Sequence, residues 1–184
     1  MEMGISPAWT IYESPLGPLT VLAGPGGVTD VRFPEPRTSR LDRAERREMP
    51  AVTGQLDEYF AGERRQFDLE LDLRGDPLRR LVWARLREIP YGTTVSYGEL
   101  AGRIAESDFP RGLEAYQRVR LAAAAIGKTP TPILVPCHRV IGADGSLTGY
   151  GGGLERKRAL LELEGTPIGR GAASGPADSQ LALL

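Results

Sequence analysis

Residues 131–142 read TPILVPCHRVIG and hold Cys137 and His138, the only cysteine and the only histidine among 184 residues. A lone cysteine after an apolar run is most often a small buried hydrophobe. Two prolines, Pro132 and Pro136, bracket this run, and a glycine-rich loop follows a few residues later. Such surroundings are more typical of an active-site rim than of a core strand, so a structural thiol and a reactive centre both stay open here.

A reactive cysteine must first lose its proton, because the thiolate is the nucleophile. At the ordinary pKa of about 8.5, only a few per cent of a thiol is ionised at neutral pH. His138 is the only imidazole that could accept the proton. Adjacent side chains point in different directions, so a water between the two groups is the natural geometry. We therefore expect an ionised sulfur at the mouth of a cavity, and an orienting carboxylate that these residues alone do not identify.

The composition excludes several classes of protein. One cysteine permits no internal disulfide and suits a reducing compartment, and one Cys with one His makes no plausible zinc site. No apolar run approaches the 18 or so residues of a membrane span. The N-terminus, MEMGISPAWTIYES, lacks the basic start and apolar core of a signal peptide. We expect a cytoplasmic monomer of bacterial type that does not associate with membranes.

The charge is unevenly distributed along the chain. Residues 1–77 carry nine Arg and fourteen acids (−5), residues 78–160 thirteen Lys or Arg and seven acids (+6), and residues 161–184 one Arg and three acids (−2). The basic middle segment contains Cys137, so it allows a phosphate-facing surface there. A solvated arginine-rich surface explains the same numbers.

The first third of the chain predicts strands. WTIYES, LTVLAG and VTDVRF are short apolar runs separated by Gly and Pro, as in an antiparallel meander. Residues 34–50 read as a loop with at most a short helix. VTGQLDEYFAG predicts a helix ending at Gly62, with an apolar face of Val52, Leu56, Tyr59 and Phe60. FDLELDL alternates strictly over residues 67–73 and predicts a half-buried strand.

From residue 76 the pattern becomes mainly helical. Asp76 can cap a helix that starts at Pro77, and Ser96 with Glu99 forms a capping box for a helix through about residue 105. LEAYQRVRLAAAAIG predicts a helix closed by Gly127, and LERKRALLELEG one closed by Gly165. Between them, KTPTPILVP should be extended because of its prolines. Residues 171–184 read as a flexible tail.

PCHRV, preceded by PILV and followed by TGYGGGLERK and LLELEG, closely resembles the O6-alkylguanine-DNA alkyltransferases, which repair DNA in a single turnover. SPLGPLTVLAGPGGVTDVRF, LDEYFAGERRQFDLELDL and VWARLREIPYGTTVSYGELA resemble other parts of that family. The resemblance implies an α+β fold. A ribonuclease-H-like α/β domain would span residues 1–75, and a helical, winged-helix-like DNA-binding domain residues 76–170.

The resemblance also implies a mechanism. Cys137 would attack the alkyl carbon on guanine O6 and keep the alkyl group. His138 would draw the thiol proton through a water, Glu164 would orient the imidazole, and Tyr97 would donate toward N3 of the base. The reaction is an in-line displacement at carbon, so we expect no metal and no cofactor. Arg139 is expected to brace the fold.

The implied partner is double-stranded DNA that contains O6-alkylguanine. Its target atom is hidden in the duplex, so the nucleotide must be flipped out. Arg120 matches the family's intercalating arginine, and the alanines that follow, with Ala122 and Ala123 among them, give a small-residue face for the minor groove, which is only about 6 Å wide. The same alanines also suit a helix by propensity alone.

The base pocket implied by the family takes Ile126, Val140, Tyr150 and Gly151. The carbonyls of Cys137 and Val140 would read the guanine amine, and the Gly151 N–H would face the base.

Three features depart from the family pattern. Thr129, placed among the DNA contacts, replaces the usual asparagine before a hinge proline and cannot reproduce both amide functions. Arg120-Leu-Ala-Ala replaces the usual start of the recognition helix. About nine extra residues lie between Tyr97 and Arg120. Three alternatives stand. One is a damage-sensing DNA binder that does not repair, which normally lacks the cysteine; another is a degenerate DNA binder disabled by the insertion. The third is an unrelated cysteine hydrolase, which the Cys–His adjacency disfavours.

Overall fold

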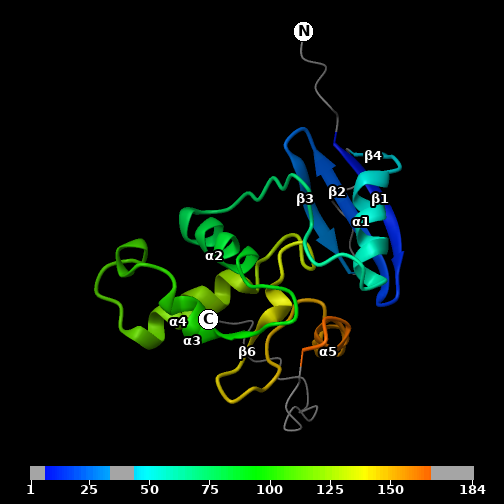
Figure 1. The fold of residues 1–184 in the computed structure, drawn as a ribbon. Coiled ribbons are helices and arrows are strands. Elements are labelled where there is room, and N and C mark those ends of the chain that lie inside the picture. The colour runs from blue at the N-terminus through cyan, green and yellow to red at the C-terminus, as the bar shows by residue number, and fades with distance from the viewer. Residues whose placement is uncertain (1–6, 34–43, 167–184) are drawn as a thin grey trace.

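The N-terminal part of the chain forms a four-stranded sheet beside one helix (Figure 1). The structure is a computed structural model that describes residues 7–33 and 44–166. Strands β1 (Ala8–Ser14), β2 (Gly17–Gly24) and β3 (Gly27–Arg32) form the predicted antiparallel meander. The two-residue strand β4 (Glu45–Arg46) pairs in parallel with β1 and gives the order β3-β2-β1-β4. Most of the predicted 34–50 loop, and the predicted tail, lie outside the described residues.

Helix α1 (Pro50–Phe60) confirms the predicted apolar face. Val52, Leu56 and Tyr59 are buried and join the core of the N-terminal sheet, and Phe60 packs against that core. Gly62, just past the helix, has φ +78°, a conformation that favours glycine. The helix is therefore held by its buried face and stops where the sequence predicted.

The predicted strand over residues 67–73 is wrong as a regular strand. The segment makes one isolated parallel bridge, between Leu71 and Val28, through Val28 N–H to Glu70 O and Asp72 N–H to Val28 O at 2.9 Å each. Its alternation still orients side chains, because Phe67, Leu69 and Leu71 pack against the N-terminal core. The alternation thus correctly predicted which side chains face the core. The number of backbone hydrogen bonds between strands depended instead on the neighbouring strand, which lies alongside at only one point.

The C-terminal part is mainly helical, as predicted. It contains α2 (Pro77–Arg87), α3 (Tyr97–Gly102), α4 (Ala115–Ile126) and α5 (Leu154–Leu163). The Asp76 side chain caps α2 at the Arg79 N–H, and both bonds of the Ser96–Glu99 capping box are present. Helix α3 ends at Gly102, earlier than the predicted residue 105. A short 3₁₀ helix, η2 (Glu106–Asp108), lies in the connection to α4.

A second correction concerns residues 128–136, which are not extended throughout. The chain turns sharply after Pro132, where Val135 N–H donates to Thr131 O at 2.9 Å and Ile133 has φ +75°. Positive φ is costly for a β-branched residue, about 1–3 kcal/mol, and persists only where the surroundings fix it. Here the Ile133 side chain is buried in the N-terminal core. The turn falls on Ile133 and Leu134, neither of which precedes a proline, so the proline preference does not reach it and tertiary packing decides its shape.

This turn carries the chain from one hydrophobic core to the other. Ile133 and Leu134 belong to the core of the sheet and α1, whereas Val135, Cys137 and Val140 belong to the core of α2, α3 and α4. The 3₁₀ helix η3 (Cys137–Arg139) follows, and strand β6 (Val140–Ile141) pairs with β5 (Val95–Ser96). The reactive segment therefore lies where the two parts of the protein meet.

The expected α+β class is confirmed, with a sheet unit first and a helical part after it. Within residues 7–33 and 44–166, no helix combines the length and apolar character that a membrane crossing requires.

Candidate active site

Cys137 lies at the start of η3 and borders an open cavity of about 710 Å³. The turn is held by Cys137 N–H donating to Val135 O at 2.8 Å and by Arg139 N–H donating to Pro136 O at 3.0 Å. The cysteine is only 6% exposed. The cavity is within the usual size range for small ligands, roughly 300–1,000 Å³.

Several predicted residues share this cavity, and the N-terminal sheet contributes a wall that the sequence did not predict. Ile126, Thr129, Tyr150 and Gly151 line it together with Cys137. The end of β3 supplies residues 30–33, and Arg156 joins them. The Tyr150 hydroxyl is buried and has no hydrogen-bond partner among the described residues. One residue of the cavity wall therefore has a buried hydroxyl without a partner in the described part of the chain.

Phe33 and Arg156 hold the glycine-rich side of the cavity. The Phe33 ring meets Tyr150 edge-on at 6.2 Å, and the Arg156 guanidinium lies 4.6 Å from the centre of the Phe33 ring. Arg156 also donates to Gly152 O and to Leu16 O, at 2.9 Å each. These contacts link the sheet to residues 150–153. They join residues that are far apart in the sequence, so the sequence alone could not predict them.

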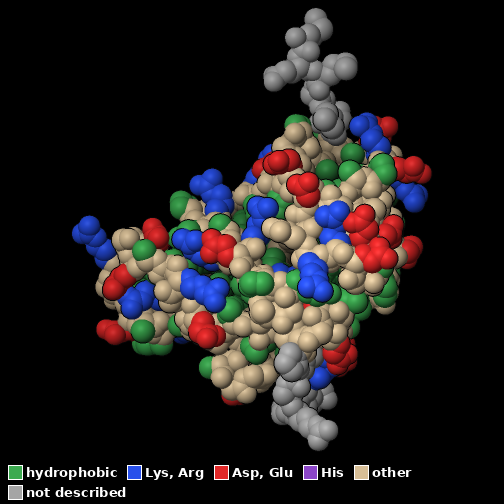
Figure 2. Space-filling model, viewed as in Figure 1, with side chains coloured by type: hydrophobic (Ala, Val, Ile, Leu, Met, Phe, Trp, Pro, Cys, Tyr) green, Lys and Arg blue, Asp and Glu red, His purple; other side chains and the backbone are tan. Residues whose placement is uncertain are grey.

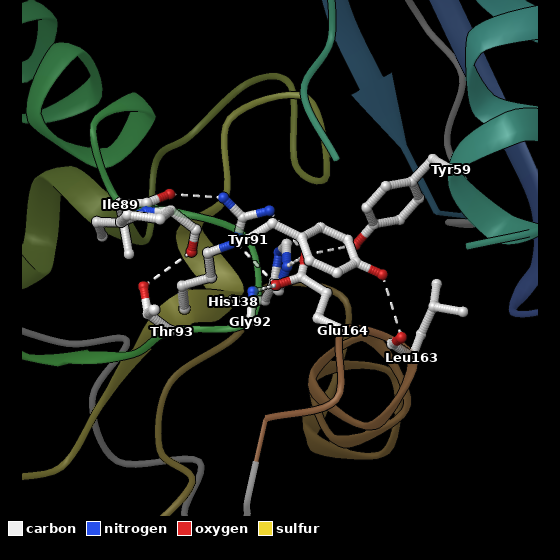
Figure 3. A network of polar contacts seen from close by, with 10 residues as sticks. Tyr59, Ile89, Tyr91, Gly92, Thr93, His138, Leu163 and Glu164 are labelled. Carbon is white, nitrogen blue, oxygen red and sulfur yellow. Dashed lines mark hydrogen bonds and ion pairs between the residues drawn. The ribbon is translucent and has the colours of Figure 1, made fainter. Parts of the chain in front are cut away.

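His138 does not line the cavity and is fully buried in a polar cluster (Figure 3). Its Nε2 lies 2.9 Å from Glu164 Oε1, and both side chains are fully buried. Nδ1 has no hydrogen-bond partner within the described residues. When the ring proton sits on Nε2 and faces the carboxylate, Nδ1 is left with its lone pair and can accept a proton.

Arg139 completes the cluster as a brace. It donates twice to Glu164, from Nε and from an Nη, at 2.8 Å each, and its other Nη donates to Ile89 O at 2.6 Å. The expectation that this arginine stabilises the fold agrees with these contacts. One further member of the cluster was not predicted from the sequence: the hydroxyl of Tyr59, on α1, donates to Glu164 Oε1 at 2.7 Å.

The cluster sets the charges at neutral pH. Burial acts to raise the pKa of Glu164, but hydrogen bonds from His138 and Arg139 outweigh it and hold that pKa well below its usual range. Burial lowers the pKa of His138, against the opposing effect of Glu164. The carboxylate is therefore ionised and the imidazole neutral, which is the form that accepts a proton.

The expected ionised sulfur is corrected by the structure. Burial raises the pKa of the Cys137 thiol to about 11, although a hydrogen bond with Thr129 and the charge of Lys157 act in the opposite direction. The resting protein thus holds a neutral thiol near a neutral imidazole. Thr129, predicted as a DNA contact, lines the cavity, and its hydroxyl donates to Ile126 O at 2.7 Å.

Tyr97 and Val140 belong to a second hydrogen-bonded network, which is only partly buried. The Tyr97 hydroxyl donates to Thr148 O at 3.0 Å. Lys157 Nζ donates to Val140 O and to Thr148 O at 2.6 Å each, and burial lowers the pKa of this lysine to about 8. Val140 is fully buried, and its carbonyl oxygen already accepts a hydrogen bond from Lys157. Only one lone pair of this oxygen is therefore left for the predicted contact with the guanine amine.

Helix α4 exposes a face that only partly matches the prediction. Arg120 and Ala124 are exposed and Ala123 is partly so. Ala122 is fully buried in the core, so its predicted contact with DNA is wrong: the helix turns that position inward. Tyr116, four residues before Arg120, is 62% exposed and shares its face, because residues four apart in a helix are neighbours. The four-residue spacing between Tyr116 and Arg120 could have identified Tyr116 as part of this face from the sequence.

The molecular surface shows the charge asymmetry of the sequence. In Figure 2, acidic side chains gather over α1 and lysine or arginine side chains over the α2 side.

Two family models together match most of the chain. Residues 8–73 match the ribonuclease-like domain of 6-O-methylguanine DNA methyltransferase, and residues 77–166 match the DNA binding domain of the same family.

Individual proteins show the same likeness. The methylated-DNA–protein-cysteine methyltransferase of Mycobacterium tuberculosis (strain ATCC 25618 / H37Rv) is 51% identical over 157 residues, covering 83% of this chain and 88% of that protein. The Haemophilus influenzae protein of that name is 37% identical over 169 residues, covering 86% and 87%. The crystal structure of M. tuberculosis OGT in complex with DNA has a TM-score of 0.73 and 48% identity, covering 85% and 92%.

The ionisation of Cys137 can be measured directly, because it is the only thiol in the chain. We expect the rate of alkylation by iodoacetamide to rise about tenfold per pH unit from pH 7 to at least pH 10 without a plateau, because only the thiolate reacts. The protein unfolded in urea is the control and should level off near a pKa of about 8.5. A folded-state profile that levels off at or below the control would contradict the neutral thiol.

Proposed function

The chain belongs to the 6-O-methylguanine DNA methyltransferase family, and on that premise we propose that it repairs DNA by transferring an alkyl group from O6 of guanine to Cys137. One observation carries the assignment to this sulfur. The single cysteine borders a cavity of small-ligand size, next to a neutral histidine whose far nitrogen is bound to a buried carboxylate. This arrangement supplies a nucleophile, a base and room for a flipped base.

The proposed reaction is a displacement at the alkyl carbon. A water passes the Cys137 proton to Nδ1 of His138, and Glu164 stabilises the imidazolium that forms. The sulfur–carbon bond forms as the carbon–O6 bond breaks, and the electron pair of that bond stays on guanine. Tyr97 would leave its bond to Thr148 O and donate toward N3 of the departing base. The product thioether holds no proton and no good leaving group, so each protein molecule reacts once.

A neutral resting thiol fits this single use. A thiolate would react with any alkylating compound or oxidant that reached it, and the protein would be lost without repair. With the pKa of Cys137 raised to about 11, the proton leaves only when the substrate carbon is in place to react. We place the protein in the cytoplasm, where thiols stay reduced.

Recognition of DNA would use α4. Its exposed face presents Arg120 and Tyr116, followed by Ala123 and Ala124, so the C-terminal half can approach a groove closely. Arg120 would enter the base stack in place of the flipped guanine. In the cavity, the unpartnered Tyr150 hydroxyl and the exposed Gly151 would face the base. We retain a division near residue 75 between a sheet domain and this DNA-binding domain.

A mass measurement tests the transfer. Duplex DNA with one O6-methylguanine should add one methyl group, about 14 Da, to the intact protein, because the thiolate keeps the carbon it attacks. Peptide mapping should place the methyl on Cys137, and the amount of modified protein should equal the amount of lesion. Cys137→Ser and DNA with unmodified guanine serve as controls and should give no adduct. Tight binding of the lesion without an adduct would instead indicate a damage-sensing binder.

The role of Arg120 predicts a defect that depends on the base stack. In Arg120→Ala, we expect the transfer rate from duplex DNA at limiting concentration to fall about tenfold, corresponding to ~1.4 kcal/mol. Single-stranded DNA with the same lesion should show a smaller loss, because no stack must be filled there. Arg80→Ala, which removes an exposed arginine of α2, is the charge-matched control. Equal losses on both kinds of DNA would rule out the intercalating role and leave only phosphate attraction, which salt weakens.

A further inference from the structure

Tyr59 connects the N-terminal part of the chain to the reactive cluster. It lies near the end of α1, its side chain is fully buried, and its hydroxyl donates to Glu164 Oε1 at 2.7 Å across 105 positions of sequence. Among the described residues, it is the only side chain of the N-terminal sheet and α1 that the structure bonds to this carboxylate. Figure 3 shows Tyr59 and His138 reaching Glu164 from different directions.

The aromatic neighbours of Tyr59 fix the direction of its hydroxyl. Its ring packs against Phe60, Phe67 and Tyr91, with centroid separations of 5.3, 5.2 and 6.1 Å. Burial and the nearby Glu164 charge both raise the pKa of Tyr59, so the phenol keeps its proton across the working range. The hydroxyl is therefore a permanent donor with one available acceptor.

Tyr59 and His138 share one oxygen. Glu164 Oε1 accepts from Tyr59 at 2.7 Å, from an Arg139 Nη at 2.8 Å and faces His138 Nε2 at 2.9 Å, while Oε2 accepts from Arg139 Nε at 2.8 Å and Gly92 N–H at 3.4 Å. A carboxylate has about four lone-pair positions, so this one is fully used. Negative charge drawn toward Tyr59 and Arg139 stabilises a charged imidazole less strongly than the same charge would without these donors.

The other groups that face His138 act in a known direction. Besides Glu164, they are Arg139 in η3 and Lys157 on α5, and both cations oppose a positive charge on the ring. Tyr91, in the loop after α2, lies on the far side of the carboxylate, and its hydroxyl donates to Leu163 O at 3.1 Å. Glu164 is thus the one group that favours protonation of His138, and its partners decide how strongly.

We propose that Tyr59 is a positioning residue for the alkyl transfer: by donating to the oxygen that also binds His138, it moderates the carboxylate and keeps the imidazole in its neutral, proton-accepting form. This role rests on the proposed function. It also gives the N-terminal part a task in the chemistry, since without the Tyr59 hydroxyl more of the Glu164 charge would act on His138 and raise the pH at which the ring becomes charged.

The test uses the fact that His138 is the only histidine of the chain, so its ring signals in a ¹⁵N NMR titration are unambiguous. In the wild type, we expect the proton on Nε2 and a titration midpoint below the ordinary value of about 6.5. Tyr59→Phe removes only the hydroxyl and should raise this midpoint by about half a pH unit or more, since more carboxylate charge then reaches the ring. The acid limb of the transfer rate should move upward by the same amount.

Tyr12→Phe is the matched control. It also removes a tyrosine–carboxylate bond, from Tyr12 on β1 to Asp57 Oδ1 on α1 at 2.8 Å, which is not part of the Glu164 cluster. It should leave the midpoint unchanged. Should Tyr59→Phe fail to fold, 3-fluorotyrosine at position 59, a stronger donor, should lower the midpoint instead.

A His138 midpoint that is the same in the wild type and Tyr59→Phe would overturn the proposal, and so would a uniform loss of rate at every pH. This outcome is distinct from failure of the proposed function. If the wild-type protein takes up no methyl group, the repair assignment is wrong, whereas the NMR comparison still decides whether Tyr59 sets the state of His138.

Discussion

The buried carboxylate of Glu164 is the interaction on which the rest of the structure depends. It collects donors from three separate segments, namely Tyr59 on α1, Gly92 after α2, and His138 with Arg139 in η3, and Glu164 itself lies in a fourth, just after α5. An unpaired charge in such a place would be costly, whereas a fully bonded one joins the segments in a single arrangement. The same residue therefore fixes how the two cores meet and how the histidine is oriented.

The consequence for function is a site that is kept unreactive until it is used. The turn at Ile133 carries the chain between the cores and places Cys137 at the cavity with little exposure. Burial then favours the neutral form of both the thiol and the imidazole. For a protein that is consumed in one reaction, a low reactivity of the resting thiol is as useful as a fast transfer. Both properties follow from the exclusion of solvent from the site.

Local signals predicted local structure well. Asp76, the Ser96–Glu99 box and Gly165 marked helix ends that the structure confirms, because caps act within one turn. The Cys137–His138 pair was evident from its rarity, and Glu164 only through the family motif. Features set by distant contacts could not be predicted: the turn at Ile133, the single bridge at Leu71, the inward position of Ala122, and Tyr59, whose partner lies 105 residues away. The ionised sulfur was predicted from chemistry that ignored burial.

The most direct test of this account is the free energy of unfolding of Glu164→Gln, measured in urea from pH 7 down to pH 3, with Glu162→Gln at an exposed position of α5 as the control. Because the folded-state pKa of Glu164 is depressed, its contribution is complete above the unfolded value of about 4.3 and is lost as the pH falls below it. We expect a loss of about 3–5 kcal/mol at pH 7, shrinking toward pH 3, and little change in the control. A small loss at pH 7, or one independent of pH, would contradict the central role of this carboxylate.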